Sequence, residues 1–209
     1  MSKLLVASHN QKKLKELQKI LKETFDSAQF RKIELVSLSQ FPNVHEVIED
    51  GKTFEENAIK KAIGYAKQTG LLTLADDSGL CVDALNGEPG IFSARYAGEE
   101  KDDVANCVKV INQIREVTES KRTGRFECVI AIADPEKVIG TSRGVVEGMI
   151  LPEMRGEGGF GYDPLFYYPP FKQTFGEVDF SRKAQVSHRS KALKLAIQIL
   201  SNYLSDNKL

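Results

Sequence analysis

The sequence has 209 residues, and its 29 Lys and Arg side chains balance its 29 Asp and Glu side chains, so the formal net charge is zero. This length suffices for one large domain or for two lobes with a substantial core. A balanced charge argues against a general polyanion binder, whose affinity depends on a strongly basic surface. Any site for an anion must therefore be local.

The three cysteines, Cys81, Cys107 and Cys128, are an odd number and lack the close spacing of a zinc site or a redox pair. Each lies within an apolar pattern, which favours buried, reduced thiols over a disulfide or a catalytic role. The apolar runs are shorter than the roughly 20 residues of a membrane helix, and charged residues follow the N-terminus too soon for a signal peptide. We therefore expect a cytoplasmic protein.

A strand and a helix are expected at the start of the chain. Residues 3–7 read Lys-Leu-Leu-Val-Ala, as a buried strand does, and Leu14, Leu17 and Leu21 follow at helical spacing. The turn between them, residues 8–13, gathers a hydroxyl, an amide, lysines and the backbone N–H groups of a helix N-terminus. These groups suit a phosphate-binding turn, although a turn that merely caps the helix beneath solvated lysines explains the same residues at least as well.

A second strand is expected over residues 33–38, followed by a loop over residues 41–47. Thr53 with Glu56 three residues later is a capping-box signal for a second helix. Apolar residues then recur at helical spacing until Gly70, which is expected to end the helix.

Two pairs of acidic residues flank this helix. Asp76 and Asp77 follow an apolar run, which predicts a short buried strand that the backbone leaves at the acids, with Gly79 permitting a sharp exit. Two desolvated neighbouring carboxylates need a cation beside them, which suggests a divalent metal site or a general base. Glu49 and Asp50 precede the helix and either share a metal with Asp77 or are simply favoured by the helix dipole.

The middle of the chain is expected to supply mainly structure. Residues 81–98 carry several turn signals and predict a structured loop that can hold an Arg over an active site. A hairpin of residues 125–133 and 138–146 around a turn at 134–137 requires only a packing explanation. A helix is expected over residues 101–117, with these residues facing inward: Val104, Val108, Ile111 and Ile114.

Residues 155–166 contain four glycines in a run of six, which allow close approach of the backbone to a ligand. Phe160 and Tyr162 offer flat faces on which a base can stack, and Asp163 follows them. A glycine-rich turn before a strand is the alternative, but the two aromatic residues and the Asp favour a nucleobase pocket.

Near the C-terminus, Lys183, His188 and Arg189 gather at the start of a helix. Cations are disfavoured there by the helix dipole unless an anion or a ligand carbonyl compensates, although His188 can also be explained as a surface cap. The helix is expected to face inward with Leu193, Ala196, Ile197, Leu200 and Leu204. We predict a single α/β domain over residues 1–209 with a mixed sheet, and two lobes around a cleft.

A triphosphate, a divalent cation and a stacked base would satisfy these features together, which indicates a nucleotide-processing enzyme. Six motifs in order also resemble those of the inosine triphosphatase-like noncanonical purine nucleoside triphosphate pyrophosphatases, over essentially the whole chain. The motifs are Ser8-His9-Asn10 with Lys13, residues 49–58, residues 75–80, residues 89–96, residues 158–164, and Ser187-His188-Arg189.

The resemblance implies an elongated mixed-sheet fold, a homodimer, and Mg²⁺-dependent hydrolysis of ITP, dITP or XTP to the monophosphate and pyrophosphate. It implies that Asp77 is the catalytic carboxylate and, with Glu49, a metal ligand; Glu56 remains the alternative second ligand. The expected substrate-binding residues are Ser8, His9, Asn10, Gln11, Lys12, Lys13, Ser78, Phe160, Gly161, Tyr162, Asp163, Lys183, His188 and Arg189.

In the expected mechanism, Asp77 orients or deprotonates the attacking water and Lys13 offsets charge on the pyrophosphate leaving group. A 6-oxo purine would accept hydrogen bonds where adenine presents an amino group. Two alternatives remain open. One is a pyrophosphatase of modified pyrimidine nucleotides on a similar fold, and the other is a nucleotide-binding module without catalysis.

Overall fold

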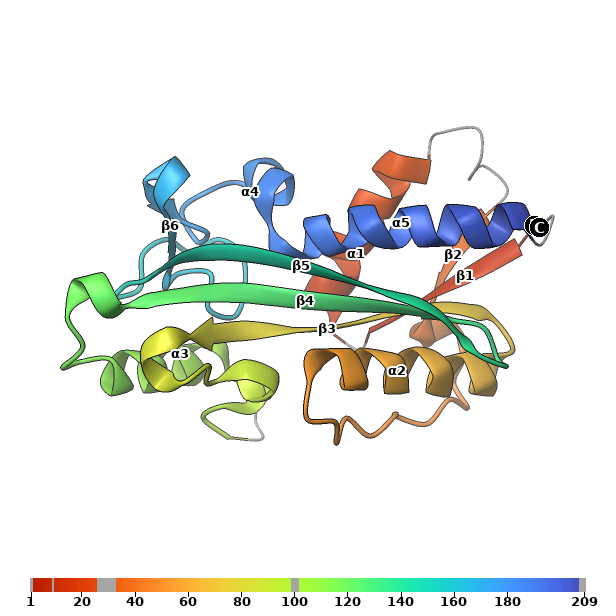
Figure 1. Ribbon diagram of the computed structural model, residues 1–209, viewed down its shortest axis with the longest axis horizontal. Coiled ribbons are helices and arrows are strands. Elements are labelled where there is room, and N and C mark those ends of the chain that lie inside the picture. The colour runs from red at the N-terminus through yellow and green to blue at the C-terminus, as the bar shows by residue number, and fades with distance from the viewer. Residues whose placement is uncertain (1, 9, 26–32, 99–101, 207–209) are drawn as a thin grey trace. The chain divides into compact units, whose positions relative to one another are not determined.

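The structure, a computed structural model, describes residues 2–8, 10–25, 33–98 and 102–206. This part of the chain contains five α-helices. Helices and strands alternate at first, successive strands then follow, and two helices come last, as Figure 1 shows. The helices are α1 (Gln11–Phe25), α2 (Phe54–Thr69), α3 (Asp103–Gln113), α4 (Phe180–Val186) and α5 (His188–Asp206). The strands are β1 (Ser2–Ala7), β2 (Ile33–Ser37), β3 (Leu72–Val82), β4 (Thr123–Ala133), β5 (Val138–Ile150), β6 (Phe166–Tyr168) and β7 (Gln173–Thr174).

The strands form one mixed sheet in the order β2-β1-β3-β4-β5-β6-β7. β1 runs parallel to β2 and β3, whereas β6 pairs antiparallel with β5 and β7. A turn closed by the Asp134 N–H donating to the Lys137 carbonyl joins β4 to β5, so the predicted hairpin is confirmed. The predicted α/β class with a mixed sheet is likewise confirmed.

The chain divides into two compact units. The first unit comprises the described residues within 1–77, 128–144 and 189–209, and the second comprises those within 78–127 and 145–188. β3, β4 and β5 each continue from one unit into the other. The division agrees with the two expected lobes, while a single domain over residues 1–209 stays a prediction.

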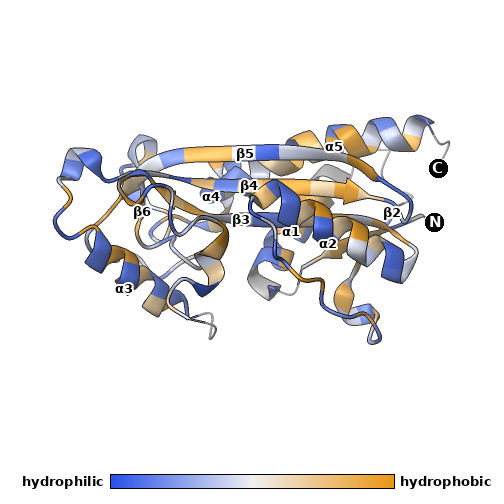
Figure 2. Cartoon of the chain, turned by 60° about the horizontal axis from the view of Figure 1, so that its bottom comes forward, coloured by the Kyte–Doolittle hydropathy of each residue, from blue (hydrophilic) through white to orange (hydrophobic). Residues whose placement is uncertain are grey.

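The core of the first unit is built from α1, α5 and the apolar residues of β1, β3 and β4. Figure 2 shows polar and apolar residues mixed along α1 and α5, as in amphipathic helices. Every residue predicted to face inward is buried in these helices: Leu14, Leu17, Leu21, Leu193, Ala196, Ile197, Leu200 and Leu204. None of the described helices is long and apolar enough to cross a membrane.

The core of the second unit contains an aromatic group and the buried face of α3. The ring of Phe126 lies 4.7 Å from that of Phe166. The prediction that Val104 and Val108 face inward is wrong, because their exposed fractions are 58% and 43%. Two apolar stripes run along this helix, and the buried one is Cys107, Val110 and Ile114, with Ile111 partly buried beside it.

β3 corrects the expectation that the backbone leaves the sheet at the two aspartates. The strand continues through Asp76, Asp77 and Gly79 to Val82, because side chains alternate between the two faces of a strand and each carboxylate meets a cation on its own face. Gly79 therefore does not make a turn. A Cβ at Gly79 would lie 2.3 Å from both the Gly90 carbonyl oxygen and Ser93 Oγ, so the glycine lets the loop carrying these residues pack on β3.

We expect Gly79→Ala to destabilise the protein by about 1–3 kcal/mol, because the added methyl group overlaps a backbone oxygen that cannot rotate away. Gly140→Ala is the matched control, since a Cβ there would meet its nearest neighbour, the Ile199 side chain, at 3.1 Å. Urea denaturation of both variants measures the difference. Equal midpoints for the two variants would contradict this role of Gly79.

Candidate active site

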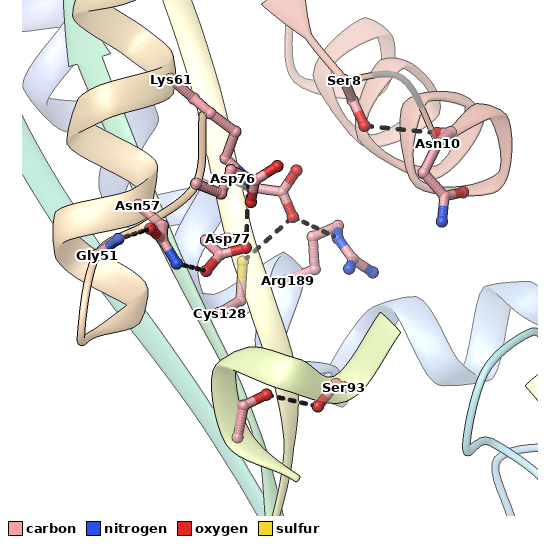
Figure 3. Close-up of polar contacts among 12 residues, drawn as sticks. Ser8, Asn10, Gly51, Asn57, Lys61, Asp76, Asp77, Ser93, Cys128 and Arg189 are labelled. Carbon is pink, nitrogen blue, oxygen red and sulfur yellow. Dashed lines mark hydrogen bonds and ion pairs between the residues drawn. The ribbon is translucent and has the colours of Figure 1, made fainter. Parts of the chain in front are cut away.

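The Asp77 carboxylate is held by two side chains of α2, as Figure 3 shows. Asn57 Nδ2 donates to Asp77 Oδ2 at 3.3 Å, and Lys61 Nζ donates to Asp77 Oδ1 at 3.2 Å. Asn57 and Lys61 are four residues apart and therefore lie on one face of the helix. Lys61 Nζ also donates to Glu49 Oε2 at 2.8 Å, so one ammonium group joins two carboxylates. We call Glu49, Asn57, Lys61 and Asp77 the Asp77 cluster.

The segment before α2 is fixed by the same side chains. Asn57 Oδ1 accepts a hydrogen bond from the Gly51 N–H at 2.8 Å, which ties this segment to the helix that contacts Asp77. Glu56, the alternative metal ligand, is exposed, and its Oε2 accepts from the Lys52 N–H at 2.7 Å. Thr53 Oγ1 accepts from the Glu56 N–H at 3.1 Å, so Glu56 belongs to the cap of α2. Of the two alternatives, Glu49 is the one that shares a cation with Asp77.

Burial controls the electrostatics of the Asp77 cluster. The pKa of Asp77 is raised above its ordinary value because burial disfavours the carboxylate more than the charges of Lys61 and Lys13 favour it. Burial alone would lower the pKa of Lys61, yet Asp77 and Glu49 raise it well above its ordinary value. Lys61 therefore stays charged beside a carboxyl group that binds a proton more readily than an exposed Asp.

Asp76 has a different environment from its neighbour. Arg189 Nε lies 3.5 Å from Asp76 Oδ2, and Cys128 Sγ lies 4.0 Å from the same oxygen. Burial would raise the pKa of Asp76, but the charges of Lys13, Arg189 and Lys61 outweigh it and hold this pKa below its ordinary value. Asp76 is therefore a buried, ionised partner of cations of the chain.

Arg189 is buried, and Nη1 of its guanidinium donates to Glu16 Oε2. The anions that compensate the basic start of α5 are thus Glu16 and Asp76, which belong to the chain itself. The expected contact of Arg189 with a substrate stays a prediction. Its observed contacts make it the cation that holds Asp76 in place.

The N-terminal turn follows β1 directly beside the two aspartates. Ala7 pairs with Ala75 in the parallel register, so the turn begins where Asp76 follows on the neighbouring strand. Asn10 Oδ1 accepts from the Lys13 N–H at 3.1 Å, which is a helix cap, and Ser8 Oγ donates to the Asn10 carbonyl at 3.5 Å. His9 lies outside the described residues, and so do the side chains of Gln11 and Lys12.

In the second unit, residues 158–163 form a loop that we call the glycine loop. Asp163 Oδ2 accepts from the Phe160 N–H at 2.8 Å and from Lys183 Nζ at 2.6 Å. Lys183 Nζ also lies 4.9 Å from the centre of the Phe160 ring. Gly159 has φ +73°, and a Cβ there would lie 2.0 Å from Asp163 Oδ2, so a glycine is required for this close contact.

Two residues predicted in the base site are more buried than expected. Tyr162 is 4% exposed and its hydroxyl donates to the Ser93 carbonyl at 2.8 Å, so its ring is part of the core and its faces are not available for stacking on a base. His188 is not a surface cap, because it is buried and stacks on Phe126 at 4.8 Å. Phe160 and Ser78 are partly exposed.

The predicted site residues did not include Asn57, Lys61 or Glu16. The spacing of Asn57 and Lys61 on one helical face was the available signal for the first two. Glu16 lies four residues before Ile20 on the apolar face of α1, and a charged residue at such a position indicates a buried ion pair. All three cysteines are buried, and none forms a disulfide.

The fold and these contacts define an α/β protein with a mixed seven-stranded sheet and a buried group of acids and cations at its parallel strands. Residues 4–199 match the Ham1 family, and the chain belongs to this family. The family expected from the six motifs is thereby confirmed.

Relatives of known name and structure extend over nearly the whole chain. A protein of Desulforamulus reducens named dITP/XTP pyrophosphatase is 54% identical over 95% of this chain and 96% of its own length. A solved HAM1 protein from Coxiella burnetii is 41% identical with a TM-score of 0.83, covering 99% of this chain and 100% of its own. The Ham1 protein of Staphylococcus aureus is 39% identical with a TM-score of 0.82 and the same coverage.

Proposed function

We propose that the protein hydrolyses noncanonical purine nucleoside triphosphates, ITP, dITP and XTP, to the monophosphate and pyrophosphate. The observation that carries the proposal is the Asp77 cluster, in which a buried carboxylate is held by an amide and an ammonium group beside the N-terminal turn. The name of the Desulforamulus reducens relative supports the same activity. Such an enzyme would remove damaged purines from the nucleotide pool.

In this proposal Asp77 orients the attacking water and accepts its proton. A raised pKa suits that role, because a carboxylate with a higher pKa is a stronger base. Asn57 and Lys61 hold the two carboxylate oxygens, which limits the directions from which water approaches. Lys13, whose charge reaches both aspartates, would offset the charge that develops on the pyrophosphate leaving group.

The glycine loop would bind the base. The Phe160 ring is partly exposed and offers a stacking face, and Lys183 lies beside it as a donor whose direction is set by Asp163. The 6-oxo group of hypoxanthine or xanthine accepts a hydrogen bond from such a donor, whereas the 6-amino group of adenine donates and would leave the Lys183 N–H that is directed at the base without an acceptor. The free-energy cost of a buried donor without an acceptor would weaken the binding of adenine nucleotides relative to hypoxanthine and xanthine nucleotides.

The donor set of the Asp77 cluster fits Mg²⁺. Asp77 and Glu49 already converge on one cation, Lys61 Nζ, and Mg²⁺ is commonly bound by one or two carboxylates with the remaining positions taken by water and substrate phosphates. Among the described residues no group of three or more His, Cys, Asp or Glu side chains is arranged for a metal, so water and substrate phosphates would have to supply the other ligands. When bound, the ion supplies positive charge to the phosphate oxygens.

Glu49→Gln should raise the Mg²⁺ concentration needed for half-maximal pyrophosphate release by about 10–100-fold, because a neutral amide is a weaker ligand for a hard cation. Glu56→Gln is the matched control, since Glu56 is exposed and bonded to the Lys52 N–H. A Mg²⁺ titration of both variants measures the effect. A shift for Glu56→Gln with none for Glu49→Gln would reverse the assignment.

We further infer from the family resemblance that the protein is a cytoplasmic homodimer, and that its two units work as one domain over residues 1–209.

A panel of nucleotides with Mg²⁺ and pyrophosphate detection tests the proposal. We expect turnover of ITP, dITP and XTP at least about 100-fold above ATP in kcat/KM, the discrimination that one mismatched hydrogen bond provides. Preference for dTTP or UTP would favour the pyrimidine alternative. Tight binding of ITP without Mg²⁺ and without pyrophosphate release would favour the binding module.

A further inference from the structure

Helix α3 binds both the N–H and the carbonyl group of one residue of the glycine loop, Gly161. Asp103 Oδ2 accepts a hydrogen bond from the Gly161 N–H at 2.9 Å. Cys107 Sγ lies 3.4 Å from the Gly161 carbonyl oxygen and donates to it. Asp103 and Cys107 are four residues apart, so one face of the helix holds both polar groups of Gly161.

The chemistry of the two side chains suits these contacts. Burial, together with the charges of Asp103 and Asp163, raises the pKa of the Cys107 thiol to about 12, so the thiol keeps its proton and can donate. Gly161 has φ +60°, a backbone conformation that residues with side chains seldom adopt. This conformation determines the orientation of the two residues on either side of Gly161. One of those neighbours is Phe160.

The loop around Gly161 is held at each successive residue. The Phe160 N–H is bound by Asp163, Gly161 is bound by α3, and the Tyr162 hydroxyl is bound by the Ser93 carbonyl. The first contact lies within the loop itself and the third fixes a core ring. Of these three contacts, those from α3 are therefore the ones that hold the residue next to Phe160 from outside the loop, while Lys183 lies beside the partly exposed Phe160 ring itself.

We propose that Asp103 and Cys107 are positioning residues, which set the orientation of Phe160 and thereby the strength of base binding. The proposal rests on the proposed function of the glycine loop as the base site. Neither side chain needs to touch the substrate, because both act through Gly161.

Asp103→Ala should raise the KM for ITP by about tenfold and change kcat by less than about twofold, because a stacking contact is made equally in the ground state and the transition state. Asp103→Asn should restore most of the loss, since the amide oxygen still accepts from the Gly161 N–H. Cys107→Ala should raise the KM for ITP by a smaller factor, because a thiol is a weak donor. Cys107→Ser should bring the KM back toward the wild-type value, because the hydroxyl can donate to the same carbonyl.

Asp102→Ala separates positioning from helix stability. Asp102 caps α3, with Oδ1 accepting from the Val104 N–H at 2.8 Å and the Ala105 N–H at 3.1 Å. Its loss weakens the same helix without removing a contact of Gly161. We expect Asp102→Ala to lower the melting temperature as much as Asp103→Ala and to leave the KM for ITP unchanged. An equal rise in KM for both variants would overturn the proposal.

We call the hydrogen bond from the Gly161 N–H to Asp103 the anchor. Hydrogen exchange at the Gly161 amide tests this anchor without any activity assay. Exchange should be at least about tenfold faster in Asp103→Ala than in the wild type, and unchanged in Asp102→Ala, because only the first removes the acceptor. If the wild type does not hydrolyse ITP but the Gly161 amide loses protection as expected, the proposed function fails and the anchor stands. If exchange is unchanged in Asp103→Ala, the anchor itself is wrong.

Discussion

Asp77→Asn should lower the rate of pyrophosphate release from ITP by about 10²–10⁴-fold, which is the contribution of a general base. Asn has the same shape as Asp, and its single amide oxygen can still accept from Lys61, which keeps β3 and α2 in contact although the hydrogen bond from Asn57 is lost. The amide cannot take a proton from water. The variant should therefore remain folded while it loses turnover.

Circular dichroism and thermal melting establish that the Asp77→Asn protein is folded, and single-turnover kinetics measure the chemical step. Asp83→Asn is the matched control, because Asp83 is an exposed acid whose partner is Arg125 at 2.8 Å. We expect the control to retain wild-type turnover. Near-wild-type turnover in folded Asp77→Asn would remove Asp77 from the mechanism.

Arg189→Met should destabilise the protein by about 3–5 kcal/mol, because it leaves Glu16 and Asp76 buried without the cation that both contact. Methionine has a comparable length and fills the space with apolar atoms, so the loss reflects charge more than packing. Urea denaturation gives the free energy of unfolding. Arg182→Met is the control, since Arg182 is exposed and should cost less than about 1 kcal/mol.

Adding Glu16→Gln to Arg189→Met should recover part of the loss, because one of the two uncompensated carboxylates is then neutral. A coupling energy of about 0.5–3 kcal/mol between the two changes is expected for groups in direct contact. Strictly additive losses would show that the pair does not interact. A loss below about 1 kcal/mol for Arg189→Met would contradict the buried charge network as a whole.

The elements with strong local signals were predictable from the sequence. The apolar spacing of Leu14, Leu17 and Leu21 determines the inward face of α1, and Thr53 and Gly70 mark the ends of α2. These signals are local, because they depend on periodicity and on capping side chains.

The course of β3 was not predictable in the same way. A run of Asp-Asp-Ser-Gly looks like an exit from a sheet because these residues favour turns. Here Lys61 and Arg189 come from distant parts of the chain and compensate the two carboxylates on opposite faces, so the strand continues. Which apolar stripe of α3 is buried likewise depends on packing against the core of the second unit. The sequence of a helix with two apolar stripes does not show which of them is buried.

The sequence allowed us to predict which types of residue belong to the candidate site, but not which side chains they contact. Asp77 and Glu49 were expected to share a metal, and the structure adds that Lys61 joins their carboxylates. Arg189 was expected at the substrate, yet its contacts are with Glu16 and Asp76. A sequence shows that charges are present, whereas their pairing depends on which faces the fold brings together.

The products formed from ITP test the central proposal most directly. Wild-type protein is incubated with ITP and Mg²⁺, and the products are separated and identified. We expect inosine monophosphate and pyrophosphate in equal amounts, since attack is proposed at the bond that releases pyrophosphate as the leaving group. Inosine diphosphate with orthophosphate, or unchanged ITP, would contradict the proposal.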